Sequence, residues 1–170
     1  MMSIKLNYTV LASPIVFALM FSGSDLGANE FVTRSCVPNA DVQMILELHN
    51  QQRSEGARCG RKWLRAASPL SFNCQLAEAA LKHTQDMAEN GFMGHQGSDG
   101  SDISARANKV KYSWQRLGEN VAKGLVPPVE INDMWLASRD HCKNIMNREF
   151  TEMGAARIND YWTVMFGRQQ

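Results

Sequence analysis

Four cysteines behind an apolar N-terminal segment constrain this chain more than any other feature of its sequence. They are Cys36, Cys59, Cys74 and Cys142. An even number of cysteines in an exported chain predicts two disulfides, formed in an oxidising compartment. No two of them form a C-x-x-C pair, which argues against a zinc ribbon or a thioredoxin-type site. Spacing alone leaves the three possible pairings open.

The N-terminal segment has the order of a secretory signal peptide. Lys5 is the only charged residue before Asp25, an apolar stretch covers residues 10–21, and small and polar residues follow it. A basic region, an apolar region and a small-residue exit together predict a signal peptide over residues 1–28. The apolar stretch is short for a bilayer span, so an uncleaved membrane anchor is the alternative rather than the first interpretation. We therefore expect a secreted or periplasmic protein with no membrane span after cleavage.

Size and charge exclude some classes of function. The 170 residues fit a single domain. The net charge is +1, and removing Lys5 and Asp25 with the signal peptide leaves it unchanged. Binding to nucleic acid requires a clustered basic surface, so we expect no nucleic-acid partner.

The spacing of apolar residues predicts helices in the first part of the chain. A first helix follows Asn39 and stops at Gly56, and a second begins after Asn73 and ends at Gly91. A basic, irregular stretch over residues 58–68 is expected between them. The capping residues Asn and Gly stand where helix ends need them.

Shorter elements and a hairpin complete the pattern. In chain order we predict a glycine-rich loop over residues 91–104, a helix over 103–110 and a short strand over 119–122. A helix opened by Pro127 follows, with Val129, Ile131, Met134 and Trp135 inward. A short helix then begins at Arg139 or Asp140. Two strands over residues 153–158 and 161–166 flank the turn-prone pair Asn159-Asp160. Helices first and a hairpin last favour an α+β fold.

Two of the four histidines lie on apolar helix faces. His49 and His83 are therefore expected to be core or boundary residues, with Asn50 and Arg53 as local partners of His49. This interpretation gives neither histidine a functional role.

The other two histidines lie where a side chain can face a cleft. His95 leaves a predicted helix into the glycine-rich loop. His141 stands near a predicted helix start, where the neutral imidazole is favoured over the cation. A neutral imidazole can bind a metal or accept a proton.

Several short motifs resemble, in their order and spacing, those of the CAP superfamily, which comprises cysteine-rich secretory proteins, antigen 5 and pathogenesis-related 1 proteins. These motifs are HNQQR at 49–53, PLSFN at 69–73, DMAENGFMGH at 86–95, GENVA at 118–122, WLAS at 135–138, NIMN at 144–147 and YWTVMF at 161–166. The resemblance covers residues 41–167 and is closest to bacterial members. It implies a single CAP, or SCP-like, domain with a three-layer α-β-α sandwich around a small antiparallel sheet.

The resemblance also implies a cleft, which CAP domains typically line with two histidines and two glutamates. His95, Glu119 and His141 match three of these positions, and the second glutamate has no clean counterpart, although Asp140 is a possible fourth cleft residue. Some CAP domains are linked with zinc, so His95 and His141 are candidate ligands of Zn²⁺. The alternative is a structural hydrogen-bond cluster in which Glu119 orients a histidine.

For the disulfides, the resemblance implies that Cys59 pairs with Cys142, because the two cysteines occur together in bacterial relatives. Cys36 and Cys74 are then left to pair with each other. A local pairing of Cys59 with Cys74 is the alternative, since a short loop closes easily.

Two functions from different classes remain open. The first is a non-enzymatic exported binding domain for a small or lipid-like ligand or an envelope component. The alternative is a metal-assisted hydrolase of peptide or cell-envelope substrates, with a metal at His95 and His141 and with Glu119 as base. A structural or adhesive module is a third interpretation. The sequence contains no G-x-S-x-G or H-E-x-x-H motif.

Overall fold

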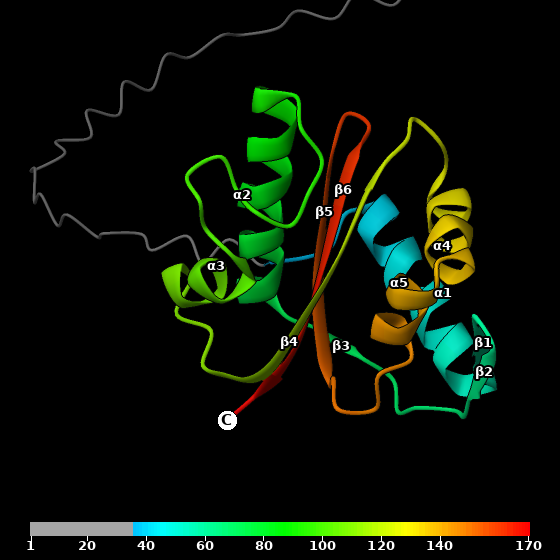
Figure 1. Ribbon diagram of the computed structural model, residues 1–170. Coiled ribbons are helices and arrows are strands. Elements are labelled where there is room, and N and C mark those ends of the chain that lie inside the picture. The colour runs from blue at the N-terminus through cyan, green and yellow to red at the C-terminus, as the bar shows by residue number, and fades with distance from the viewer. Residues whose placement is uncertain (1–35) are drawn as a thin grey trace, which may run out of the picture. The chain divides into compact units, whose positions relative to one another are not determined.

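The structure is a computed structural model that describes residues 36–170 (Figure 1). The predicted signal peptide lies outside these residues. The helices are α1 (Ala40–Glu55), α2 (Cys74–Asn90), α3 (Ile103–Lys109), α4 (Pro128–Ala137) and α5 (Arg139–Ile145). The strands are β1 (Ala57–Cys59), β2 (Lys62–Leu64), β3 (Ser71–Phe72), β4 (Trp114–Lys123), β5 (Glu152–Ile158) and β6 (Tyr161–Gln169).

The central sheet has the strand order β3-β5-β6-β4. β5, β6 and β4 pair antiparallel, and the two-residue strand β3 joins the edge of β5 in parallel. Helices α2 and α3 cover one face of the sheet, and α1, α4 and α5 cover the other (Figure 1). The predicted α+β class and its three α-β-α layers are therefore confirmed.

Local capping explains where the two long helices begin and end. The Asn39 side chain accepts a hydrogen bond from the Val42 amide, and Asn73 caps α2 in the same way. Gly91 ends α2 in the left-handed conformation, with φ of 68°. Both predicted helices are confirmed, because each boundary is encoded by a residue that satisfies the free backbone groups of a helix end.

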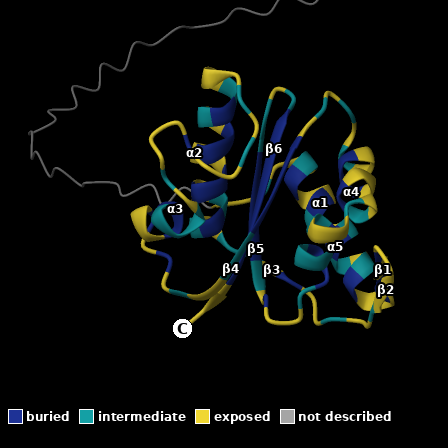
Figure 2. Cartoon of the chain, in the orientation of Figure 1, coloured by how far each residue is buried: buried dark blue, intermediate teal, exposed yellow. Residues whose placement is uncertain are grey.

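Buried residues fill both spaces between the helical layers and the sheet (Figure 2). On the α2 side, the helix lies directly against β5 at Gly154. A Cβ atom at this position would lie 2.0 Å from the Ala77 amide nitrogen. Only glycine allows so close an approach, so Gly154 sets the distance between α2 and the sheet.

Three local predictions differ from the structure. The stretch 58–68, expected to be irregular, contains the β1–β2 hairpin, whose turn includes Gly60 with φ of 64°. Its three-residue strands are too short to give a periodic signal. Strand β4 extends well beyond the predicted residues 119–122. In α4, Ile131 and Trp135 are buried as expected, but Val129 and Met134 are exposed, because only one side of this helix packs on the sheet and α1.

The disulfides join Cys59 to Cys142 and Cys36 to Cys74, the pairing that the resemblance implies. The first links the β1–β2 hairpin to α5, and the second links the chain before α1 to the start of α2. Within residues 36–170, no helix is long and apolar enough to cross a membrane.

Candidate functional site

The site is built around Glu119, a buried carboxylate on the edge strand β4. Only 6% of the residue is exposed. Its oxygen Oε1 accepts a hydrogen bond from His95 Nδ1 at 2.9 Å, and Oε2 accepts one from Arg106 Nη2 at 2.7 Å. Both oxygens of Glu119 therefore hold a neighbouring side chain.

Arg106 supplies the positive charge that allows Glu119 to be buried. It comes from α3 and is itself buried. Its guanidinium also donates to the backbone carbonyls of Ser101 and His95, each at 2.9 Å. One side chain thus ties the glycine-rich loop to the carboxylate. This role was not predictable from the sequence, because an arginine in the last turn of a short helix is usually exposed.

His83 is buried beside the same carboxylate. Its Nε2 lies 2.8 Å from the carbonyl oxygen of Gly94 and 3.9 Å from Glu119 Oε1. Burial lowers the pKa of His83, so the neutral ring donates from Nε2 to Gly94. The prediction of a core or boundary histidine holds, and the residue also supports the loop that carries His95.

A second contact fixes the same loop to α2. Asp86 accepts hydrogen bonds from the backbone amide of Ser98, at 2.8 Å, and from the Ser98 hydroxyl. These bonds lower the pKa of Asp86 against the opposing effect of its partial burial. Arg106 therefore holds the loop at His95 and at Ser101, and Asp86 holds it between them, at Ser98.

His95 is the exposed member of the cluster, with 61% of its side chain accessible. The hydrogen bond to Glu119 raises the pKa of His95 above its ordinary value. In the neutral ring this bond places the proton on Nδ1, which leaves the Nε2 lone pair free. Glu119 thus orients His95 and selects its tautomer.

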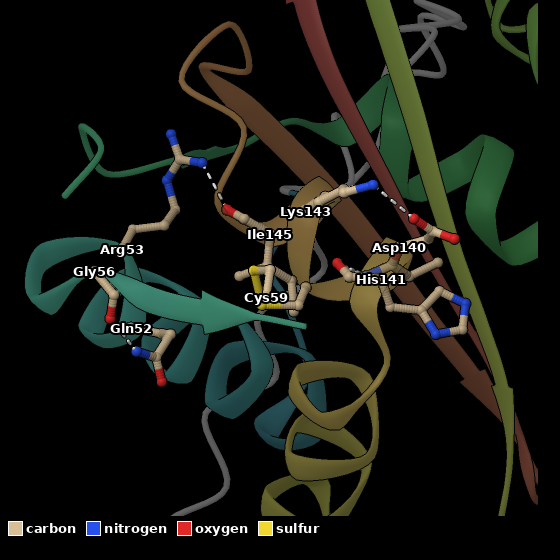
Figure 3. The surroundings of a disulfide bond; sticks show 10 residues. Gln52, Arg53, Gly56, Cys59, Asp140, His141, Lys143 and Ile145 are labelled. Atoms are coloured by element: carbon tan, nitrogen blue, oxygen red, sulfur yellow. Dashed lines mark hydrogen bonds and ion pairs between the residues drawn. A yellow bond between two sulfur atoms is a disulfide. The ribbon is translucent and has the colours of Figure 1, made fainter. Parts of the chain in front are cut away.

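His141 reaches the same edge of β4 from the other face of the sheet. Its backbone carbonyl accepts from Asn120 Nδ2 at 3.1 Å, and Asn144 donates to the Glu119 carbonyl at 3.0 Å. These bonds fix α5 against β4, and the His141 ring points towards that strand (Figure 3). Burial, and then the charge of nearby His95, lower the pKa of His141. Its ring is therefore held in the neutral form.

Asp140, the possible fourth cleft residue, lies away from this cluster. Its side chain is 82% exposed and forms an ion pair with Lys143 at 2.9 Å (Figure 3). The same pairing lowers the pKa of Asp140. The structure brings His95 and Glu119 into contact and places His141 nearby, but it directs Asp140 to Lys143.

The expected local partners of His49 were wrong. Within residues 36–170, neither ring nitrogen of His49 has a hydrogen-bond partner. Its neighbours are the rings of Trp135 and Phe166. Asn50 instead bonds to the backbone of residue 70, and Arg53 bonds to carbonyl groups elsewhere in the chain. Arg53 is buried on the same helix face as His49, but its guanidinium is used by these carbonyl groups and not by the His49 ring.

The donor set for a metal at this site is small. Across the described part of the chain, no group of three or more histidine, cysteine, aspartate or glutamate residues is arranged to hold a metal ion. Glu119 already uses both oxygens. The ring nitrogens that remain available are His95 Nε2 and those of the His141 ring, and nitrogen lone pairs of this kind are common zinc ligands.

Replacing Glu119 with glutamine should lower the pKa of His95. The change removes the negative charge that stabilises the imidazolium and leaves the positive charge of Arg106 in place. An opposite charge at this distance typically shifts a pKa by about 1 unit or more. Titration of the His95 ring by NMR measures the change. Glu149→Gln, at an exposed glutamate paired with Arg116, is the matched control and should leave the titration of His95 unaltered.

Together, the fold and site define a disulfide-bonded α-β-α sandwich with a carboxylate-oriented histidine at the edge of its sheet. The model of the CAP, or cysteine-rich secretory protein, family matches residues 46–166. The chain therefore belongs to the CAP family.

Relatives and solved structures agree with this membership. The uncharacterized protein YkwD of Bacillus subtilis is 28% identical over 130 residues, which are 75% of this chain and 47% of the relative. An extracellular SCP-domain protein from Bacillus anthracis is 28% identical, with a TM-score of 0.68 over 76% of this chain and 40% of that one. A cysteine-rich secretory protein from Staphylococcus aureus, 19% identical, shares the fold with a TM-score of 0.60 over 76% and 38% of the two chains. The chain thus spans less than half the length of each of these three proteins.

Proposed function

We propose that this protein is an exported, non-enzymatic binding module, and that the edge of β4 at His95 and His141 is its ligand site. The two imidazoles reach this edge from opposite layers, and neither is enclosed in the core. A small or lipid-like ligand or an envelope component is the proposed partner. The extracellular SCP-domain protein of Bacillus anthracis supports export to a secreted or periplasmic location.

The hydrogen bonds of Glu119 favour a binding function over hydrolysis. A metal-assisted hydrolase would use this carboxylate as the base that takes a proton from water. Here one oxygen faces Arg106, the other faces His95, and the residue is buried. A base must lie within hydrogen-bond reach of the proton that it removes. Glu119 therefore suits an orienting role, which supports the binding function.

A divalent ion fits this proposal as an accessory group. His95 and His141 would hold it through their free ring nitrogens, and Glu119 would fix the orientation of His95 as a carboxylate does behind many zinc-bound histidines. Zn²⁺ would supply a positive charge that attracts an anionic or polarised group of the ligand. Two protein ligands leave part of its coordination to water or to the bound partner.

Equilibrium dialysis with Zn²⁺ at neutral pH tests the proposed pair of ligands. The parent protein should bind one ion per chain, and His95→Ala and His141→Ala should each lower the affinity at least about tenfold, since loss of one of two ligands removes half of the protein's contribution. Glu119→Gln should weaken binding too, because a carboxylate would no longer fix the proton of His95 on Nδ1.

Asp140→Asn is the control, because Asp140 pairs with Lys143 rather than with a histidine. It should bind Zn²⁺ like the parent. Equal binding by the parent and both histidine variants would contradict the metal site. Hydrolysis of a peptide or envelope substrate that is lost in the histidine variants would contradict the non-enzymatic function.

A further inference from the structure

A groove separate from the histidine site lies between the β1–β2 hairpin and α5. Its volume is about 540 Å³. Trp63, Leu64 and Arg65 form one wall, and Lys143, Met146, Asn147 and Arg148 form the other. Met146 is buried and forms an apolar floor, whereas the Trp63 indole is 62% exposed.

The groove concentrates positive charge in a chain that is nearly neutral overall. Among residues 57–65 and 139–148, seven are arginine or lysine and one, Asp140, is acidic. Asp140 is already paired with Lys143. Three of the cations line the groove itself, and the residues that line it include no acid. The site therefore has the electrostatic character of an anion-binding surface.

The two walls are held at a fixed separation. The Cys59–Cys142 disulfide crosslinks the hairpin to α5 (Figure 3). The Arg139 side chain packs on the hairpin turn, within 3.3 Å of where a Cβ of Gly60 would lie. Trp63 packs against Gly56, whose φ is 83°. A rigid groove loses little conformational entropy when a ligand binds.

The groove faces away from the candidate histidine site. Lys143 and His141 are two residues apart on α5, which places them on opposite sides of a helix with 3.6 residues per turn. His141 is directed to β4, and Lys143 borders the groove. A ligand can therefore occupy the groove without contact with His95.

We propose that this groove binds an anionic saccharide. A sugar ring has an apolar face of C–H groups that can stack on the exposed Trp63 indole. Arg65 and Arg148 can bind a carboxylate or sulfate group of the sugar in the bidentate manner of guanidinium. The volume lies in the range of small-ligand sites. Carboxylated and sulfated saccharides both offer an anionic group of this kind to the two arginines.

The same features fit a membrane surface less well. Interfacial binding needs a broad apolar face that enters the headgroup region. Among the described residues 57–65 and 139–148, which surround the groove, Trp63 is the only large apolar side chain that is exposed. The floor at Met146 is recessed and buried, so a flat bilayer could not reach it.

Isothermal titration with three oligosaccharides tests the proposal: oligogalacturonate, a heparin oligosaccharide and an uncharged maltooligosaccharide. At least one of the two anionic probes should bind, more weakly as salt increases, and the neutral one should not. Trp63→Ala should weaken binding at least about tenfold, as truncation of a central aromatic contact usually does. Trp63→Tyr should restore part of the affinity, because it keeps a flat ring.

The double variant Arg65→Glu with Arg148→Glu should abolish binding. Its control, Lys111→Glu with Arg168→Glu, makes the same change in net charge at two exposed residues outside the groove. Thermal unfolding checks that each variant is folded. Four results would overturn the proposal. They are an equal loss of binding in both double variants, unchanged binding by Trp63→Ala, equal binding of the neutral probe, and no binding of either anionic probe. Trp63-dependent binding to phosphatidylglycerol vesicles without saccharide binding would assign the groove to membranes instead.

Discussion

Replacing Arg53 with methionine should lower the free energy of unfolding by at least about 4 kcal/mol, because several hydrogen bonds from a buried charged group would be lost together. The Arg53 side chain is fully buried. It donates to the carbonyl oxygens of Ser68, Ile145, Asn147 and Phe150 at 2.7 to 3.0 Å. These carbonyls belong to segments that are far apart in sequence. One guanidinium therefore joins α1 to the segment before β3 and to the segment between α5 and β5.

Methionine keeps much of the volume of arginine but satisfies none of these carbonyls. Burial lowers the pKa of Arg53 only to about 10, so the guanidinium is charged at neutral pH and its bonds are charge-assisted. Arg53→Lys should fall between the parent and Arg53→Met, because an ammonium group cannot reach four acceptors with the planar arginine geometry. Arg168→Met, at an exposed arginine, is the matched control. Urea unfolding curves for Arg53→Met and Arg168→Met that differ by under about 1 kcal/mol would contradict this role of Arg53.

Features encoded over a few residues were predictable from the sequence. Asn39 and Asn73 cap their helices, Gly91 ends one, and the pair Asn159-Asp160 turns the β5–β6 hairpin. Each is a local interaction between a side chain and nearby backbone. The β1–β2 hairpin escaped prediction because its strands are too short to give a periodic signal. Its disulfide between Cys59 and Cys142 and its packing on α5 are both long-range.

The candidate site also contains residues that could be predicted from the sequence and residues that could not. His95 stood out because a glycine-rich loop lets a side chain face a cleft, and His141 because it stands near a predicted helix start. The family resemblance added Glu119. Arg106 escaped notice, since its partners Glu119 and His95 are defined only once α3 packs beside β4. A buried ion pair forms only when the tertiary structure brings its members together, and the seven residues of α3 do not show that their one arginine turns inward.

His49 should make the protein less stable as the pH falls from 6.5 towards 3. Burial, and then the charge of Arg53, lower the pKa of His49 from 6.5 to about 3. Between these two values the unfolded chain binds a proton at His49 that the folded protein does not. The stabilising contribution of neutral His49 is therefore fully present above pH 6.5 and is lost as the pH falls, by about 1.4 kcal/mol per pH unit.

His49→Leu removes this titration and keeps a side chain of similar size between Trp135 and Phe166. Unfolding free energies of parent and variant, measured in urea from pH 7.5 to 4.5, should diverge in their pH slopes below pH 6.5, and the parent should have the steeper fall. His83 and His141 also have lowered pKa values, but they are common to both proteins and cancel in the comparison. His95→Leu is the control with the opposite sign, because the pKa of His95 is raised and its contribution is lost as the pH increases. Parallel pH profiles for the parent and His49→Leu would show that the buried ring is protonated in the folded protein, or that water reaches it.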